Sequence, residues 1–366
     1  MVNGPALRIA VLSPVSWRTP PVHYGPWELF ASTLTEGLVA RGHEVTLFAS
    51  ANSITTATLA AVVPVGTSED PTIDPKVAEC THIASLFERA AEFDIIHNNF
   101  DFLPLTYSRL VDTPMVTTIH GFSSPRIVPV YERYNDRSAY VAISDANRHP
   151  ALTYAATIHH GIDTGRFGLH PAPAATLLFF GRIHPDKGTH VAIEVAKRSG
   201  RPLLIAGIIQ DEAYFERLVR PHIDGVDVTF VGAVAAQDCA DLLGGAAALL
   251  HLIDFEEPFG FSVAEAQACG TPVIAFDRGS MRELIQHGRT GFVVDGVDAA
   301  VSAVDSLASL DRTYIRKYAL LRFDVNRMIA QYVAVYRLLL EHGLETFRAT
   351  GTRVQPTRRH RGNESL

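Results

Sequence analysis

The chain has 366 residues, of which 47% are hydrophobic and 19% charged, and its formal net charge is −7. This length predicts two domains, and this composition is typical of a globular chain rather than a disordered one. The acidic balance gives no basic field that would attract nucleic acid, and three scattered cysteines argue against a disulfide framework or a Cys-rich metal site.

No apolar run in the sequence reaches the roughly 20 residues that a membrane-spanning helix needs, and the first residues lack the apolar core of a secretory signal. We therefore expect a cytoplasmic protein without a transmembrane segment. Peripheral attachment to a membrane stays open, although no clear feature of the sequence supports it.

The first half of the chain alternates between short apolar runs and amphipathic segments. Residues 8–13 predict a buried parallel strand, and residues 27–41 predict a helix. The apolar face of this helix is expected to carry Leu29, Phe30, Leu34 and Leu38. The other elements predicted in this half are a helix near 77–92 and strands at 44–49, 95–97, 115–120 and 140–144.

A Pro- and Ala-rich stretch at 170–175 separates this half from a second series with the same alternation. We place the two domains at 1–168 and 169–323. The second series is predicted to contain strands at 177–180, 203–206, 228–231, 248–251, 273–276 and 292–294, and helices at 189–198, 212–219, 236–243 and near 261. The segment 324–349 predicts a long amphipathic helix, and 350–366 a flexible basic tail.

Two carboxylates eight residues apart form the most informative motif of the chain. Glu257 precedes a Pro-Phe-Gly turn, and Glu265 lies about one turn into a short Ala-rich helix. A helix start gathers free backbone N–H groups and the positive end of the helix dipole, so it suits an anion. A ligand with phosphates and many hydroxyls, such as a sugar nucleotide, fits between two such carboxylates. For either carboxylate alone, a solvated charge at a helix start is an equally good interpretation.

The whole run resembles glycosyltransferase family 4. The features that carry this resemblance are the Glu-x7-Glu spacing, the Pro-Phe-Gly turn, the following Ala-x-Gly-x-Pro-Val, and Gly279 and Glu283. The resemblance covers about 8–345. It implies an α/β protein of the GT-B fold, with two doubly wound Rossmann-like domains facing across a cleft. It also implies that the N-terminal domain holds the acceptor and the C-terminal domain the donor, and that the last helix crosses back to the N-terminal domain.

A second motif, Gly181-Arg182-x4-Lys187-Gly, follows a predicted strand and precedes a helix. Arginine offers a planar fork and lysine a compact charge, and both suit a diphosphate. Two ordinary surface cations are the alternative for this loop on its own. The family resemblance implies that Arg182 and Lys187 hold the leaving pyrophosphate. With no Asp-x-Asp in the chain, we expect no metal and no cofactor beside the nucleoside-diphosphate sugar, which is a substrate.

His120 ends an apolar strand in the sequence Thr-Thr-Ile-His-Gly, where a structural role is the alternative. The resemblance places it beside the transferred sugar, where it positions a sugar hydroxyl or a backbone carbonyl. Gly25 matches a glycine loop of the family that borders the phosphates, but Pro26 replaces the usual second glycine and removes one N–H donor. His97 follows a strand and is expected to line the acceptor side.

The remaining site residues are assigned by the resemblance. It implies that Glu257 binds sugar hydroxyls and Glu265 the ribose hydroxyls. Backbone N–H groups of Phe259, Gly260 and Phe261 are expected at the sugar or phosphate. Backbone at Gly232 and Val234 is expected at the base. His160, which replaces an asparagine of the family, is expected in a structural turn between the domains.

These observations favour a metal-independent, retaining transfer of a hexosyl unit from a nucleoside-diphosphate sugar to a hydroxyl acceptor, which is a sugar, a lipid-linked sugar or a small molecule. A dinucleotide oxidoreductase is a rival, but the first strand–helix turn lacks Gly-x-Gly-x-x-Gly. A non-catalytic nucleotide-sugar or carbohydrate-binding protein, an epimerase and a phosphorylase on the same fold stay open. The sequence leaves open the base and sugar of the donor, the acceptor, the pathway and the oligomeric state.

Overall fold

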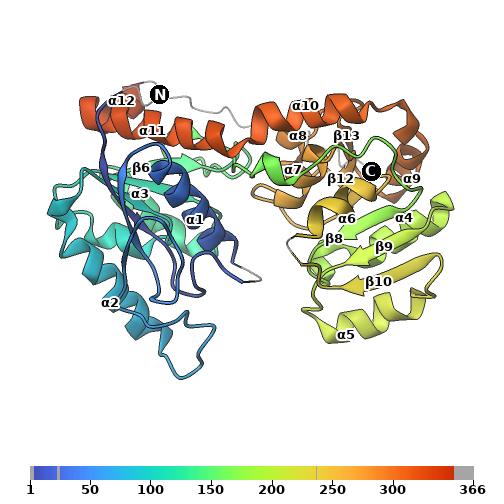
Figure 1. Ribbon diagram of the computed structural model, residues 1–366, viewed down its shortest axis with the longest axis horizontal. Coiled ribbons are helices and arrows are strands. Elements are labelled where there is room, and N and C mark those ends of the chain that lie inside the picture. The colour runs from blue at the N-terminus through green and yellow to red at the C-terminus, as the bar shows by residue number, and fades with distance from the viewer. Residues whose placement is uncertain (1–3, 23–24, 236, 350–366) are drawn as a thin grey trace, which may run out of the picture.

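The computed structural model describes residues 4–22, 25–235 and 237–349. It has two α/β domains, each built on one parallel sheet with helices packed against it (Figure 1). The predicted fold of two doubly wound domains is thereby confirmed. The predicted tail at 350–366 lies outside the described residues.

The N-terminal sheet has the strand order β3-β2-β1-β4-β5-β6-β7. Its order reverses between β1 and β4, which is the place where sheets of this kind bind ligands. The strands are β1 (Arg8–Leu12), β2 (Glu44–Phe48), β3 (Thr58–Ala60), β4 (Ile95–Asn98), β5 (Met115–Ile119), β6 (Ser138–Ala142) and β7 (Tyr154–Thr157). The helices are α1 (Pro26–Val39), α2 (Pro75–Phe87) and α3 (Val128–Tyr134).

The C-terminal sheet repeats this plan with the order β10-β9-β8-β11-β12-β13. Its strands are β8 (Leu177–Phe180), β9 (Leu203–Ala206), β10 (Val228–Gly232), β11 (Leu249–His251), β12 (Val273–Phe276) and β13 (Gly291–Val294). Its helices are α4 (Thr189–Ser199), α5 (Glu212–Tyr214), α6 (Cys239–Gly245), α7 (Phe261–Ala268), α8 (Met281–Leu284), α9 (Val297–Asp305) and α10 (Arg312–Phe323).

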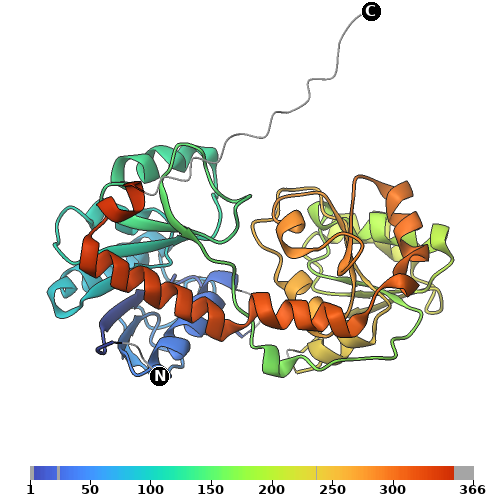
Figure 2. The ribbon, with the colours of Figure 1, turned by 90° about the horizontal axis from the view of Figure 1, so that it is seen from above.

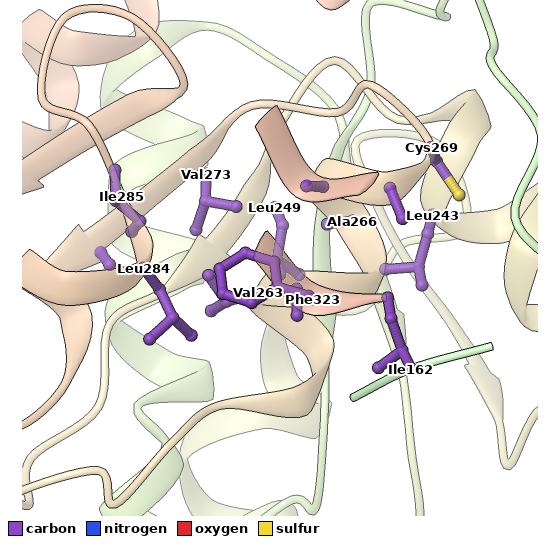
Figure 3. Packing of buried hydrophobic residues seen from close by; sticks show 14 of the residues in the cluster. Ile162, Leu243, Leu249, Val263, Ala266, Cys269, Val273, Leu284, Ile285 and Phe323 are labelled. Carbon is purple, nitrogen blue, oxygen red and sulfur yellow. The ribbon is translucent and has the colours of Figure 1, made fainter. Parts of the chain in front are cut away.

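Each sheet is covered on both faces, so its strands are continuous apolar runs rather than alternating ones. Figure 3 shows one of these cores, where Val263 and Ala266 of α7 pack with Leu249 and Val273 of the sheet and with Phe323. This packing fixes α7 on one face of the C-terminal sheet, and thereby fixes the position of the Glu-x7-Glu motif.

The chain crosses between the domains twice, and the two crossings pair with each other. The N–H of Ile162 donates to the carbonyl of Phe323 (2.8 Å), and the N–H of Val325 donates to the carbonyl of Ile162 (3.0 Å). Asp324 begins α11 (Val325–His342) by accepting from the N–H of Asn326. Figure 2 shows α11 lying along the N-terminal domain, where its apolar face joins the core beside β1 and α1.

Two sequence expectations differ from the structure in this region. The single helix predicted over 324–349 ends at His342, because Gly343 has a φ of +68°, and α12 (Glu345–Ala349) follows. In α1, Leu29 is 44% exposed, whereas Phe30, Leu34 and Leu38 are buried. The buried stripe follows the spacing 30, 34, 38, and Leu29 lies about 100° around the helix from it.

No helix in the described part of the chain combines the length and the apolar character that crossing a membrane requires.

Candidate active site

The predicted site residues come from the carboxyl ends of strands in both sheets. Arg182 follows β8, Glu257 follows β11, and Glu265 lies in α7, all in the C-terminal domain. His120 follows β5 in the N-terminal domain. Parallel strands end at one edge of a sheet, so the fold itself gathers these side chains at the two facing edges.

Lys187 and Glu257 form a largely buried ion pair. Nζ of Lys187 lies 3.2 Å from Oε2 of Glu257, and the two side chains are 17% and 14% exposed. The ammonium also lies over the ring of Phe255, 4.4 Å from its centroid. Burial alone would raise the pKa of Glu257, but Lys187 and the neighbouring His251 outweigh burial and hold that pKa at about 2. Glu257 is therefore ionised throughout the neutral range.

Arg182 stands on the same segment between β8 and α4. Its guanidinium hydrogen-bonds the side-chain oxygen of Gln210 and lies 3.5 Å from Oδ2 of Asp186. Gly181 before it donates its N–H to the carbonyl of Ala206. Among the described residues, Arg182 has one close and one long side-chain contact, so part of its guanidinium can still bind an anion.

The start of α7 has the properties of an anion site. Gly260 precedes the helix with a φ of +97°, and a Cβ there would lie 3.0 Å from Cε of Met281. Within the described residues, the N–H groups of Phe259, Gly260 and Phe261 have no hydrogen-bond acceptor. Three free donors and the positive end of a helix dipole meet beside Glu257.

Glu265 is in the opposite electrostatic state from Glu257. Its carboxylate has no hydrogen-bond partner among the residues described, and burial raises its pKa to about 7 against a smaller opposing effect of Arg166. Hydrogen-bond donors from a ligand would stabilise the ionised form of such a carboxyl group. Ribose hydroxyls are donors of this kind.

A line of stacked rings leads from the N-terminal to the C-terminal domain. His120 stacks on Trp27 and on His160, each at 5.4 Å between centroids. His160 in turn stacks on Phe261 at 4.9 Å and 8°. His160, expected only in a structural turn between the domains, thus joins the two predicted sides of the site.

His120 is almost fully buried, and burial lowers its pKa to about 3, so its imidazole is neutral. Its Nε2 lies 3.3 Å from Oδ1 of Asn99, and its Nδ1 has no partner among the described residues. A neutral imidazole with one unused nitrogen can hydrogen-bond a hydroxyl group.

The structure places His97 elsewhere than expected. Its ring is fully buried, with Nε2 2.8 Å from Oγ1 of Thr118 and Nδ1 hydrogen-bonded to the hydroxyl of Tyr336 in α11. Both ring nitrogens make hydrogen bonds inside the core. His97 therefore connects α11 to the N-terminal sheet instead of lining the acceptor side. Its position at the end of β4 is as expected, but its side chain points into the core.

The three other predicted residues lie at the expected edges. Gly25 precedes α1, and its carbonyl accepts from the N–H of Leu29. Gly232 ends β10 with a φ of +73° and accepts from the N–H of Gly207. Val234 is half-buried and packs against the core under α7. The role of each as a substrate contact stays a prediction.

Sequence reasoning missed Trp27 and His251, and it indicated Asn99 only as part of the segment 97–101 that was expected to line the acceptor side. Asn99 and His251 are polar residues that end apolar strands, and the rule that singled out His120 applies to both. Trp27 gave no sequence signal beyond its place two residues after Gly25, because its stacking on His120 depends on how the start of α1 lies relative to the residue that follows β5.

Comparison with known proteins places the chain among glycosyltransferases. Residues 28–166 match the model described as "Glycosyltransferase Family 4", and residues 166–320 match "Glycosyl transferases group 1". D-inositol 3-phosphate glycosyltransferase of Pseudarthrobacter chlorophenolicus is 38% identical over 161 residues, which are 41% of this chain and 36% of that protein's length. Phosphatidyl-myo-inositol mannosyltransferase of Mycobacterium leprae is 26% identical over 95% of this chain and 99% of its own.

A solved structure shows the same two-domain arrangement. AviGT4, a glycosyltransferase involved in avilamycin A biosynthesis, superposes with a TM-score of 0.68 at 26% identity, over 91% of this chain and 98% of its own. The two family models meet end to end at residue 166, shortly after the first crossing between the domains at Ile162, and together reach from α1 to α10. The chain therefore belongs to glycosyltransferase family 4, with the GT-B fold.

Proposed function

We propose that this chain is a retaining glycosyltransferase that moves a hexosyl unit from a nucleoside-diphosphate sugar to a hydroxyl acceptor without a metal ion. One observation carries the proposal. Two cations, an ionised carboxylate and three N–H groups without an acceptor among the described residues lie at the carboxyl edge of the C-terminal sheet, and a carboxyl group with a raised pKa lies one turn into α7. A sugar nucleotide has a group to match each of them.

The diphosphate is assigned to Arg182, Lys187 and the start of α7. Negative charge grows on the diphosphate as the bond to the sugar breaks, and fixed cations and N–H groups stabilise it there. Arg182 and Lys187 take the part that a divalent metal plays in other transferases.

The sugar and the ribose are assigned to the two carboxylates. Glu257, ionised, accepts hydrogen bonds from sugar hydroxyls, and Glu265 accepts from the ribose. His120 and the N-terminal edge hold the sugar from the other side. The bond from the anomeric carbon to the phosphate oxygen breaks, and a bond to the acceptor oxygen forms on the same face. The acceptor proton passes to an oxygen of the leaving phosphate.

The acceptor belongs on the N-terminal side, beyond His120. The names of two relatives refer to inositol-bearing acceptors. We therefore include polyols, free and lipid-linked, with sugars in the acceptor class to be tested.

A donor screen tests this proposal. Thermal shift with uridine, guanosine and adenosine diphosphate sugars, in EDTA, should reveal one base that stabilises the native state. That donor should be consumed with release of the nucleoside diphosphate. Arg182→Ala and Lys187→Ala should each lower turnover by about 2–4 kcal/mol of transition-state stabilisation, with smaller effects on unfolding.

Other outcomes of the screen identify the rivals. A non-catalytic binding protein would be stabilised by the nucleotide sugar without consuming it when acceptors are added. An epimerase would convert the sugar without releasing the nucleoside diphosphate. Activity that EDTA removes and magnesium or manganese restores would contradict the metal-independent part of the proposal.

A further inference from the structure

Lys187 is held by two other side chains of the protein. Its ammonium lies 3.2 Å from Oε2 of Glu257 and over the ring of Phe255. If Lys187 turns to a diphosphate, it leaves the carboxylate of Glu257. That carboxylate is 14% exposed, and a buried charge without a partner is strongly unfavourable.

A second donor lies beside the same oxygen. His251 ends β11 and is 6% exposed, and its Nε2 is 3.6 Å from Oε2 of Glu257. This distance is too long for a hydrogen bond. Nε2 is buried and has no hydrogen-bond partner among the described residues. Buried ring nitrogens are rarely left unpaired, so an unused one next to an engaged carboxylate needs an explanation.

We propose that His251 is a positioning residue that takes over the carboxylate of Glu257 from Lys187 when the donor binds. The proposal rests on the proposed function, because it requires that Lys187 binds the diphosphate. A small movement of either side chain closes the 3.6 Å gap, and an Nε2–H donor then replaces the ammonium. No proton is transferred in this exchange.

The exchange has two consequences for the reaction. Lys187 reaches the diphosphate without leaving an isolated buried charge behind. Glu257 keeps its charge and its direction, and its second oxygen stays available for a sugar hydroxyl. In the described part of the chain, Lys187 is the one side chain within hydrogen-bond distance of the Glu257 carboxylate, so His251 is the nearest replacement.

A double-mutant cycle measured by calorimetry tests the proposal. The ligand is whichever of UDP, GDP and ADP binds the wild-type protein most tightly. His251→Leu should weaken its binding by roughly tenfold, the effect of losing one hydrogen bond to a charged group. His251→Gln, whose amide can reach the position of Nε2, should restore most of this loss. In a Glu257→Gln background, His251→Leu should have no effect, because no charge is left behind.

Two results would overturn the proposal. An equal loss in both backgrounds would show that His251 only fills the core, and an unchanged affinity after His251→Leu would show that Glu257 needs no second partner. Thermal unfolding checks that each variant is folded. If His251→Leu does not fold, His251→Asn replaces it in the cycle, since its shorter amide cannot reach Glu257.

Lys187→Ala separates this proposal from the proposed function. If Lys187→Ala leaves the affinity for the nucleoside diphosphate unchanged, Lys187 does not bind the diphosphate, and both proposals fail. If Lys187→Ala weakens binding while the His251 cycle shows no coupling to Glu257, the role of His251 alone is wrong.

Discussion

Glu257 and Glu265 show how one residue type acquires two states within a single motif. Glu257 has Lys187 and His251 beside it, and these neighbours hold its pKa at about 2 against the opposing effect of burial. Glu265 has no hydrogen-bond partner in the described structure, and burial raises its pKa to about 7. Glu257 is ionised and can accept a hydrogen bond from a sugar hydroxyl. The ionised form of Glu265 is stabilised when a ligand supplies hydrogen-bond donors. The spacing in the sequence identified the pair, but only the packing reveals this difference.

Substituting each glutamate should separate the two ends of the donor. Glu265→Gln should weaken the binding of both the nucleoside diphosphate and the nucleotide sugar by about 1–3 kcal/mol, because the ribose hydroxyls lose a charged hydrogen-bond acceptor. Glu257→Gln should not weaken the binding of the nucleoside diphosphate. It should weaken the binding of the nucleotide sugar or lower its turnover. Calorimetry with both ligands decides this. Equal losses of nucleoside diphosphate affinity in the two variants would contradict the division of roles.

The raised pKa of Glu265 predicts a pH dependence of stability. Between pH 4.5 and about 7 the native state holds a proton on Glu265 that the unfolded chain has released. Stability from this group therefore falls as pH rises through that window, by on the order of 1–3 kcal/mol. Glu257 has the opposite sign, and its contribution is lost only as pH falls from 4.5 towards about 2. The two windows do not overlap.

Urea unfolding at pH 5 and pH 7.5 measures this effect, with Glu265→Gln as the matched control. Relative to that variant, the wild-type protein should be less stable at pH 7.5 than at pH 5. Parallel behaviour of the two proteins would show that Glu265 is ionised in the native state at both pH values.

At the level of elements, the C-terminal sheet was the most predictable part. Strands β8, β9 and β12 occupy the predicted residues, because each is a buried apolar run bounded by Gly, Pro or charged residues. Strands β3 and β7 gave no such signal. Both contain Thr or Ala, are only partly buried and lie at the edges of the N-terminal sheet.

Helices α9 and α10 were missed for a related reason. Helix α9 is a short Ala- and Val-rich segment that directly follows a strand, and α10 carries several basic residues among its apolar ones. What buries them is packing on α4 and α7, which no local pattern records. The candidate site shows the same limit, since the burial of His97 and the stacking of His160 depend on α11 and α7.

Gly279 links α8 to the Glu257 segment and gives a prediction at this scale. Its φ is +54°, and a Cβ there would overlap the backbone of Glu257. Gly279→Ala should therefore displace the Pro-Phe-Gly turn and lower stability by about 1–3 kcal/mol, with a larger loss in nucleotide sugar binding. Gly245→Ala in α6 is the control, because nothing lies within 4 Å of its Cβ position. Equal effects on ligand binding would mean that the close approach does not position Glu257.

At the level of the whole molecule, Glu283 joins the two domains. Its two carboxylate oxygens accept from the N–H groups of Asp145 (2.9 Å) and Ala146 (2.8 Å), and one also contacts Nε2 of His159 (3.0 Å). Glu283 stands in α8, whereas Asp145 and Ala146 follow β6 of the N-terminal sheet. The family pattern indicated Glu283, and in the structure its carboxylate holds the two domains together through these hydrogen bonds.

Glu283→Ala should loosen the relative orientation of the domains by removing hydrogen bonds to a charged group, about 2 kcal/mol in total. Small-angle scattering should then give a larger radius of gyration without ligand. Glu194→Ala, which removes an exposed carboxylate that pairs within α4, is the control and should leave the scattering unchanged. An unchanged radius in Glu283→Ala would show that the paired crossings alone set the orientation.

The stereochemistry of transfer tests the central claim most directly. The donor found by thermal shift is incubated with a hydroxyl acceptor, and NMR of the fresh product follows the anomeric proton of the transferred sugar. We predict release of the nucleoside diphosphate and a new glycosidic bond with the donor's anomeric configuration, both slowed by Arg182→Ala. A product of inverted configuration would contradict the account, as would conversion of the sugar without release of the nucleoside diphosphate.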